Sequence, residues 1–275
     1  DRRPKFHLYK PDIALLSGVA WDHINVFPTF EMYVEQFQLF ADSIEENGAL
    51  VYYSGDVELR RIAEKVKPGI SMFSYDTLKH KIVDGQTIIL DEGVEYPIEI
   101  FGEHNLQNLN GARLVLNQLG VSDASFYKSI ASFTGASKRL EVVKKGETGT
   151  LFKDFAHSPS KLKATLDAVK KQFESRKLVA CMELHTFSSL NQKFLSQYEG
   201  CMNKPDVSVV YFNPKTLEHK KLPPLSSEDV KSAFKRDDLL VFTESEAFVS
   251  WLQGQSWNDK NLLLMSSGNF GGLNL

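Results

Sequence analysis

The strongest fold signal in this chain is the apolar segment Ile13-Ala-Leu-Leu-Ser-Gly-Val-Ala20. A short apolar run without polar alternation is typical of a strand that is buried on both faces of a parallel sheet. Apolar residues then recur at helical spacing from Phe30 until Asn47-Gly48 ends the pattern. The segment and its surroundings therefore predict an α/β fold in which strands and helices alternate.

The alternation continues along the first half of the chain. The turn pair Asp84-Gly85 lies between two apolar runs and predicts a hairpin, so residues 80–101 should form a small antiparallel patch. Further elements are expected in the order strand 49–54, helix 57–66, strand 70–75, then strand 96–101 and helices 104–119 and 122–133.

The cluster Thr134-Gly-Ala-Ser137 is the best candidate for a boundary between two domains. Beyond it, Ser158 followed by Pro159 is a typical helix start. Strands are expected at residues 140–145, 150–155, 177–184, 207–212, 238–243 and 261–266. The second half therefore predicts a smaller, Rossmann-like α/β unit.

Composition excludes several classes of protein. The 275 residues carry a net charge of −3, which gives no field that would gather nucleic acid or an anionic membrane. No apolar run approaches the roughly 20 residues of a membrane span and no signal peptide opens the chain, so a cytoplasmic location is expected. Cys181 lies inside an apolar run, which predicts a buried thiol rather than a disulfide or a metal ligand.

Two amides stand one turn apart in Gly102-Glu-His-Asn-Leu-Gln-Asn108, at the start of a predicted helix. At this spacing Asn105 and Asn108 share one helical face. An Asn amide matches the donor and acceptor pair on the edge of adenine, so the pair could bind a nucleotide base. The alternative is simple capping, because Asn is favoured at helix starts.

Two motifs follow that pair, Lys138-Arg-Leu-Glu141 and Asp154-Phe-Ala-His157-Ser-Pro159. The order and spacing of the three motifs resemble the Mur ligases, the ATP-dependent amide-forming enzymes of peptidoglycan synthesis. The resemblance implies the C-terminal part of a Mur ligase central domain at residues 1–135, with a mostly parallel sheet, and a Mur ligase C-terminal domain at residues 136–275.

The two ends of the chain resemble one branch of that family. The opening residues 1–6, the segment Trp21-Asp-His-Ile-Asn-Val-Phe27 and the closing Met265-Ser-Ser-Gly-Asn-Phe-Gly-Gly272 are similar to the ligases that join a murein tripeptide to UDP-N-acetylmuramate. Those two small molecules are the expected partners, and ATP and Mg²⁺ the expected cofactors. An alanine-adding Mur ligase, a folylpolyglutamate-type ligase and a non-catalytic nucleotide-binding module remain alternatives.

The resemblance also implies roles for individual residues. It assigns adenine contacts to Asn105 and Asn108, an ATP contact to Arg139, ribose binding to Asp154, acceptor contacts to His157 and His185, and a magnesium ligand to His23. Asn25, Phe155 and Ser189 depart from the Asp, Tyr and Arg of relatives.

No P-loop pattern G-x-x-x-x-G-K-[ST] occurs in the sequence, so the lysine expected to contact the transferred phosphoryl group is not identified. We therefore expect these residues to be a fragment that does not ligate alone.

Overall fold

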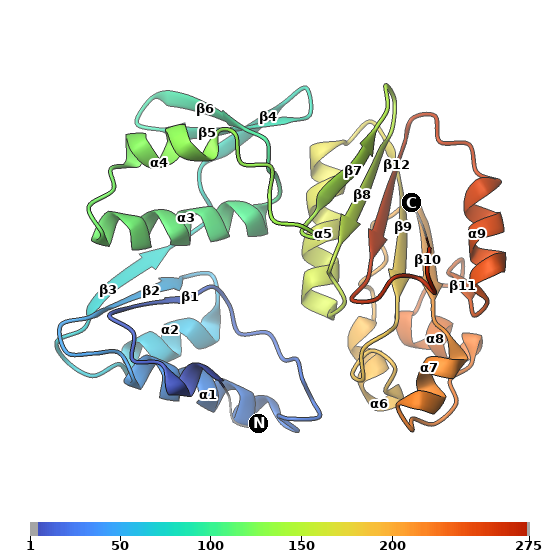
Figure 1. The fold of residues 1–275 in the computed structure, drawn as a ribbon, viewed down its shortest axis with the longest axis horizontal. Helices are drawn as coiled ribbons and strands as arrows, with labels where there is room; N and C mark the ends of the chain where they lie inside the picture. Colours follow the sequence, from blue (N-terminus) through green and yellow to red (C-terminus); the bar gives the residue numbers. More distant parts are fainter. Residues whose placement is uncertain (1–4, 274–275) are drawn as a thin grey trace. The chain divides into compact units, whose positions relative to one another are not determined.

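The computed structural model describes residues 5–273, and the chain forms two compact units, Asp1–Phe133 and Thr134–Leu275 (Figure 1). The first four residues of the opening segment used in the family resemblance lie outside the described part. The assignment of the two units to named Mur ligase domains stays a prediction.

The first unit is built on a parallel three-stranded sheet in the order β1-β2-β3. Helix α3 lies on one face of this sheet, and α1 and α2 lie on the other (Figure 1). Threonine and aspartate side chains cap α1 and α2, which explains where these helices begin. The bounds are η1 (Lys5–Leu8), β1 (Ile13–Leu16), α1 (Phe30–Asp42), β2 (Ala49–Tyr53), α2 (Val57–Glu64) and β3 (Ser71–Tyr75).

The first strand is shorter than predicted, because it ends at Leu16 and not at Ala20. The chain leaves the sheet where the backbone N–H of Val19 donates to Oδ2 of Asp56, at 2.7 Å. The other carboxylate oxygen of Asp56 caps α2 by accepting the N–H groups of Glu58 and Leu59. One aspartate therefore fixes both the helix start and the path of the apolar segment.

The predicted antiparallel patch is a three-stranded sheet of β4 (His80–Val83), β5 (Gln86–Asp91) and β6 (Val94–Ile98). Asp84 and Gly85 both have positive φ, at 50° and 77°, as a two-residue hairpin turn requires. A buried cluster of aliphatic and aromatic side chains joins this sheet to α3 (Glu103–Gln118) and α4 (Asp123–Ile130). The hairpin and both helices were predicted correctly.

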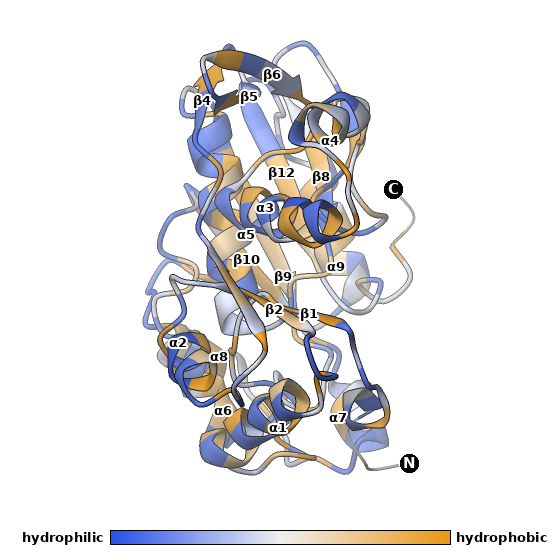
Figure 2. Cartoon of the chain, turned by 90° about the vertical axis from the view of Figure 1, so that its left-hand side faces the viewer, coloured by the Kyte–Doolittle hydropathy of each residue, from blue (hydrophilic) through white to orange (hydrophobic). Residues whose placement is uncertain are grey.

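The second unit contains a six-stranded sheet in the order β11-β10-β9-β12-β8-β7, parallel except for the edge strand β7. Helices α5 and α9 cover opposite faces (Figure 1), and the central strands are strongly hydrophobic (Figure 2). The strands are β7 (Glu141–Lys145), β8 (Thr150–Asp154), β9 (Lys177–Glu183), β10 (Val207–Tyr211), β11 (Leu240–Phe242) and β12 (Lys260–Met265). The helices are α5 (Pro159–Gln172), α6 (Gln192–Leu195), η2 (Ser196–Tyr198), α7 (Pro214–His219), α8 (Ser227–Phe234) and α9 (Ser245–Gln253).

The mixed α/β class, with largely parallel sheets and a small antiparallel patch, is confirmed. Ser158 is the residue before α5 and Pro159 its first residue, as predicted. Cys181 and Cys201 are both buried and not disulfide-bonded, and burial raises the pKa of each thiol. Within residues 5–273, no helix combines the length and hydrophobicity that crossing a membrane would require.

Candidate functional site

Asn105 and Asn108 lie in the first turns of α3, but neither caps the helix. The residue before the helix is Gly102, whose positive φ of 91° suits glycine, and no side chain caps this start. Asn105 is half-buried, and its amide nitrogen donates to the carbonyl oxygen of Phe101 at 2.9 Å. Asn108 is exposed. The capping alternative is therefore wrong, and Asn108 presents the more accessible amide of the pair.

His23 is an exposed turn residue with a positive φ of 56°. Its backbone N–H donates to Oδ1 of Asp22 at 2.7 Å, and its carbonyl oxygen accepts the N–H groups of Val26 and Phe27. Magnesium prefers six oxygen ligands, and the described residues contain no group of three or more histidine, cysteine or acidic side chains that could hold a metal. The imidazole of His23 alone does not supply the oxygen ligands that magnesium prefers, and its predicted role as a metal ligand is untested.

Asp154 ends β8 and is 5% exposed. Its oxygens Oδ1 and Oδ2 each accept one backbone N–H at 2.6 Å, from Ala156 and Leu140 respectively. Burial raises the pKa of this carboxyl, although both N–H groups and the charge of Arg139 act in the opposite direction. A side-chain hydrogen bond from Thr165 also lowers the pKa of Asp154, so protein groups occupy most of the about four lone-pair sites that two carboxylate oxygens offer.

Arg139 lies beside Asp154 in an exposed loop. Its guanidinium carbon is 5.3 Å from the centre of the Phe155 ring, within cation–π range. Lys138 and Leu140 on either side have positive φ, and the N–H of Phe155 donates to the carbonyl oxygen of Lys138 at 2.8 Å. The loop is therefore held against the end of β8, and the structure brings Arg139 and Asp154 together as a cluster with Phe155.

His157 is only 8% exposed, which limits the surface that it can offer to a substrate. Its Nδ1 lies 2.8 Å from the carbonyl oxygen of Phe155, and its ring packs edge-on against that side chain. The hydroxyl of Tyr198 donates to the carbonyl oxygen of His157. These contacts give His157 a structural role, while its predicted contact with an acceptor stays untested.

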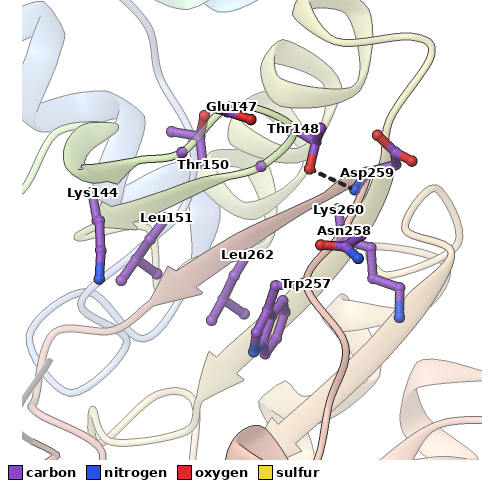
Figure 3. Close-up of a pocket in the computed structure, with 12 residues that line it drawn as sticks. Lys144, Glu147, Thr148, Thr150, Leu151, Trp257, Asn258, Asp259, Lys260 and Leu262 are labelled. Atoms are coloured by element: carbon purple, nitrogen blue, oxygen red, sulfur yellow. Dashed lines mark hydrogen bonds between the residues drawn. The ribbon is translucent and has the colours of Figure 1, made fainter.

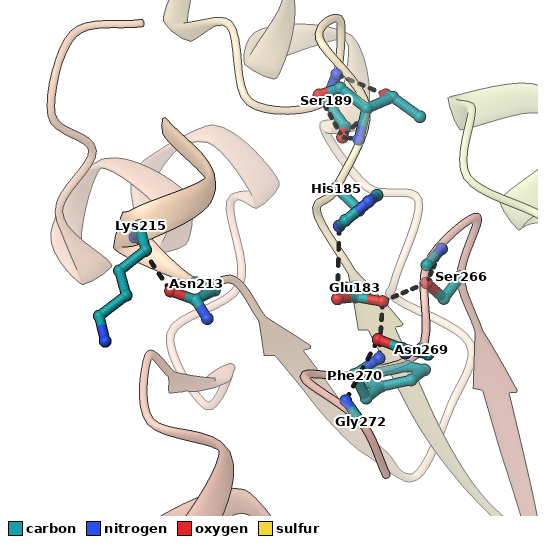
Figure 4. A network of polar contacts seen from close by, with 11 residues as sticks. Glu183, His185, Ser189, Asn213, Lys215, Ser266, Asn269, Phe270 and Gly272 are labelled. Carbon is teal, nitrogen blue, oxygen red and sulfur yellow. Dashed lines mark hydrogen bonds and ion pairs between the residues drawn. The ribbon is translucent and has the colours of Figure 1, made fainter. Parts of the chain in front are cut away.

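His185 belongs to a polar network at the carboxyl ends of β9 and β12 (Figure 4). Its Nδ1 lies 3.6 Å from Oε1 of Glu183, whose side chain is 4% exposed, whereas the His185 side chain is 41% exposed. The other oxygen, Oε2, accepts the Ser266 hydroxyl and the N–H of Phe270, the latter at 2.9 Å. Glu183 was missed from the sequence, although an acidic residue that ends an apolar strand was a usable signal.

The loop after β12 is tightly fitted to this network. A Cβ on Gly268 would lie 2.7 Å from Oε2 of Glu183 and 2.9 Å from the His185 ring. Phe270 is buried and stacks on Phe248, with ring centres 5.4 Å apart. The glycine-rich segment is therefore an ordered loop. Glu183 fixes its path on one side and aromatic packing fixes it on the other.

Ser189 is fully buried in the turn that follows His185. Its hydroxyl oxygen accepts the N–H of Thr186 at 3.0 Å, and the N–H of Ser189 donates to the Thr186 hydroxyl at 3.1 Å. The position at which the resemblance expects an arginine therefore holds a small side chain that stabilises the turn.

An open pocket of about 760 Å³ lies at the other end of the strands of the same sheet, where β8 and β12 begin (Figure 3). Leu151, Trp257 and Leu262 line its apolar part, and Lys144 and Lys260 lie at its polar part. None of the predicted site residues lines this pocket. Ligands of parallel α/β sheets bind at the carboxyl ends of the strands. The candidate site is therefore at the carboxyl ends of β8 and β9, where Asp154 and Glu183 lie.

Comparison with known proteins finds similarity to Mur ligases. Residues 3–116 match the model of the Mur ligase middle domain. A UDP-N-acetylmuramate–L-alanine ligase of Roseiflexus sp. is 26% identical over 210 residues, which is 65% of this chain and 44% of that protein. The enzyme of the same name from Lactobacillus delbrueckii is 25% identical over 260 residues, which is 88% of this chain and 56% of that protein. The chain therefore spans about half the length of these curated relatives.

Solved structures show the same fold. The UDP-N-acetylmuramate–alanine ligase of Thermotoga maritima aligns with a TM-score of 0.68 at 15% identity, covering 96% of this chain and 58% of that one. A murein peptide ligase from Psychrobacter arcticus aligns with a TM-score of 0.61 at 20% identity, covering 99% and 58%. Folylpolyglutamate synthase of Mycobacterium tuberculosis, solved with ADP and AMPPCP, aligns with a TM-score of 0.67 at 16% identity, covering 95% and 62%.

The fold is that of the Mur ligase middle and C-terminal domains. In sequence, residues 3–116 are similar to the Mur ligase middle domain.

Proposed function

We propose that this chain is the part of a Mur-type, ATP-dependent amide ligase that binds the nucleotide and the amine acceptor. The observation that carries the proposal is the cluster of Arg139, Phe155 and Asp154 at the carboxyl end of β8. An exposed guanidinium held against an aromatic ring suits a nucleotide. Ribose binding by Asp154 is proposed on the family resemblance, since this side chain is 5% exposed and each of its oxygens already accepts a backbone N–H. Adenine contacts from Asn105 and Asn108, which lie in the first unit, are proposed separately on the family resemblance.

The proposed reaction joins an amine to UDP-N-acetylmuramate through an acyl phosphate that ATP generates. L-Alanine is the first candidate for the acceptor, because both curated relatives carry that amino acid in their names. This choice replaces the murein tripeptide favoured by the resemblance of the chain ends. A role in peptidoglycan synthesis in the cytoplasm would follow from either acceptor.

The murein tripeptide remains the second candidate on specific observations. The solved murein peptide ligase covers 99% of this chain. Ser189 is a buried turn residue that cannot bind a free carboxylate as an arginine would. A longer peptide would not depend on that contact for its position.

Nucleotide binding can be tested on the 275-residue chain by calorimetry with AMPPCP. We expect Arg139→Ala to weaken binding about tenfold or more, since a contact between a guanidinium and a phosphate is charge-assisted. Lys171→Ala, an exposed charge on α5, is the matched control and should bind as the parent does. Equal affinity in all three proteins would remove the Arg139 assignment.

Acceptor choice needs the full-length gene product. Phosphate release and product mass would be measured with ATP, magnesium and UDP-N-acetylmuramate, and with L-alanine or the tripeptide as acceptor. We expect turnover with L-alanine, whereas turnover only with tripeptide would establish the second candidate. The 275 residues alone should show none, because they contain no P-loop sequence.

A further inference from the structure

Glu183 is a buried carboxylate whose two oxygens have separate partners. Oε2 accepts both the Ser266 hydroxyl and the Phe270 N–H, so this oxygen anchors the loop after β12. Oε1 lies toward Nδ1 of His185, at 3.6 Å (Figure 4). One side chain thus combines a loop anchor with a carboxylate that faces an imidazole.

Oε1 of Glu183 and Nδ1 of His185 are at ion-pair distance, beyond the range of a hydrogen bond, so the carboxylate acts on the tautomer of His185 through its charge. A neutral imidazole carries its proton on one nitrogen and a lone pair on the other, and the hydrogen-bond environment selects which. An ionised carboxylate is an acceptor only, so it favours the proton on Nδ1. The lone pair then lies on Nε2, on a side chain that is 41% exposed.

We propose that Glu183 is a positioning residue that holds His185 with Nε2 ready to accept a proton from the incoming amine. This inference rests on the proposed ligase function. The acceptor arrives as an ammonium ion, which has no lone pair for attack. Transfer of one ammonium proton to Nε2 leaves a neutral amine and an imidazolium, whose charge Glu183 stabilises. The amine can then attack the acyl carbon of the acyl phosphate; the bond from that carbon to the phosphate oxygen breaks, and phosphate leaves with the second amine proton.

The rigid surroundings support this role. Gly268 leaves no space for a side chain between its backbone and the pair, so Glu183 and His185 are packed closely by the loop. The Ser266 hydroxyl also accepts the N–H of Gly268 at 2.6 Å. Because Phe270 is packed among aromatic rings, the loop cannot move away without exposing them.

Glu183→Gln is a sharp test, because an amide has one acceptor and one donor end. The two donors at Oε2 require the amide oxygen there, so the loop anchor is kept. The NH₂ group then faces Nδ1 of His185 and, as a donor, favours the proton on Nε2. The variant should therefore keep the fold and reverse the tautomer.

The first measurement is the ¹⁵N spectrum of the His185 ring in the labelled 275-residue chain, which needs no enzymatic activity. We expect the Nδ1–H tautomer in the parent and the Nε2–H tautomer in Glu183→Gln. Asp206→Asn is the matched control, because Asp206 also anchors a backbone N–H of β9, at its opposite end. An Nε2–H tautomer in the parent, or no difference between parent and Glu183→Gln, would overturn the positioning role.

The second measurement is ligation by the full-length protein with its preferred acceptor. We expect Glu183→Gln and His185→Gln each to lower kcat about 10²-fold or more, within the range of general base catalysis, with KM for ATP unchanged. Asp206→Asn should retain the parent kcat. A tautomer reversal without loss of kcat would refute the proton-transfer step. The expected tautomers in a protein that ligates no acceptor would refute the proposed function and leave the positioning of His185 intact.

Discussion

Replacing Asp154 with Asn tests whether this carboxylate holds the loop of residues 138–140 against the end of β8. The parent side chain accepts two backbone N–H groups, from Leu140 and Ala156, at 2.6 Å each. An amide oxygen can replace only one carboxylate oxygen, so one buried N–H would face an NH₂ group.

The expected loss follows from those two bonds. A hydrogen bond to a charged group contributes about 1.5–3 kcal/mol, and an unsatisfied buried donor costs about 1–3 kcal/mol. Burial destabilises the charged form of Asp154, which raises the pKa of this carboxyl. The neutral Asn does not carry this desolvation cost, which offsets part of the loss. We therefore expect Asp154→Asn to lower the free energy of unfolding by about 2 kcal/mol.

Urea unfolding would be followed by tryptophan fluorescence, which reports mainly on the second unit because Trp251 and Trp257 lie there. Amide exchange at Leu140 and Ala156 locates the loss, and at least one of the two N–H groups should exchange faster. Asp167→Asn is the control, since the side chain of Asp167 is 42% exposed and its ion pair, at 2.6 Å, is with an exposed lysine. A loss below about 0.5 kcal/mol, with unchanged exchange at both amides, would refute the reasoning.

Three further outcomes are expected. Gly149→Ala should lower the free energy of unfolding by about 1–3 kcal/mol, because its Cβ would lie 2.4 Å from the Lys260 carbonyl oxygen, and an unchanged Tm would contradict this. Burial raises the pKa of Asp206, but hydrogen bonds outweigh it and leave the pKa lowered, so the carboxylate stabilises the fold above its unfolded pKa of about 3.9. The stability difference between the parent and Asp206→Asn should therefore be largest near neutral pH and fall as the pH drops through the folded pKa; urea unfolding that gave a pH-independent difference would count against it. Cys181 and Cys201 should react with a thiol reagent only on unfolding, so rapid labelling of the native chain would show that one of them is accessible.

Local patterns were sufficient to predict most of the fold. The helix start at Ser158-Pro159 and the hairpin at Asp84-Gly85 depend on neighbouring residues, and both were predicted correctly. The end of the first strand was predicted wrongly. The N–H of Val19 donates to the side chain of Asp56, which lies far along the chain, so this segment leaves the sheet. A contact of this kind has no local sequence signal.

The candidate site was predictable only in part. Arg139 and Asp154 could be named from motifs, and the structure places them beside each other. The cation–π contact between Arg139 and Phe155 was not predicted. The replacement of the Tyr of relatives by Phe155 suggested only that a hydroxyl contact is lost. Glu183 escaped notice since its role depends on the loop after β12, which follows it in sequence by many residues.

The position of β12 has a consequence for how the second unit folds. This strand pairs with β8 on one side and with β9 on the other, and Met265 is in register with both Asp154 and Met182. Strands β8 and β9 are made earlier on the ribosome, yet they are not neighbours in the sheet. Until β12 emerges, the hairpin of β7 and β8 has no partner on its inner side. We therefore expect this unit to fold late and slowly, because its central pairings close long loops.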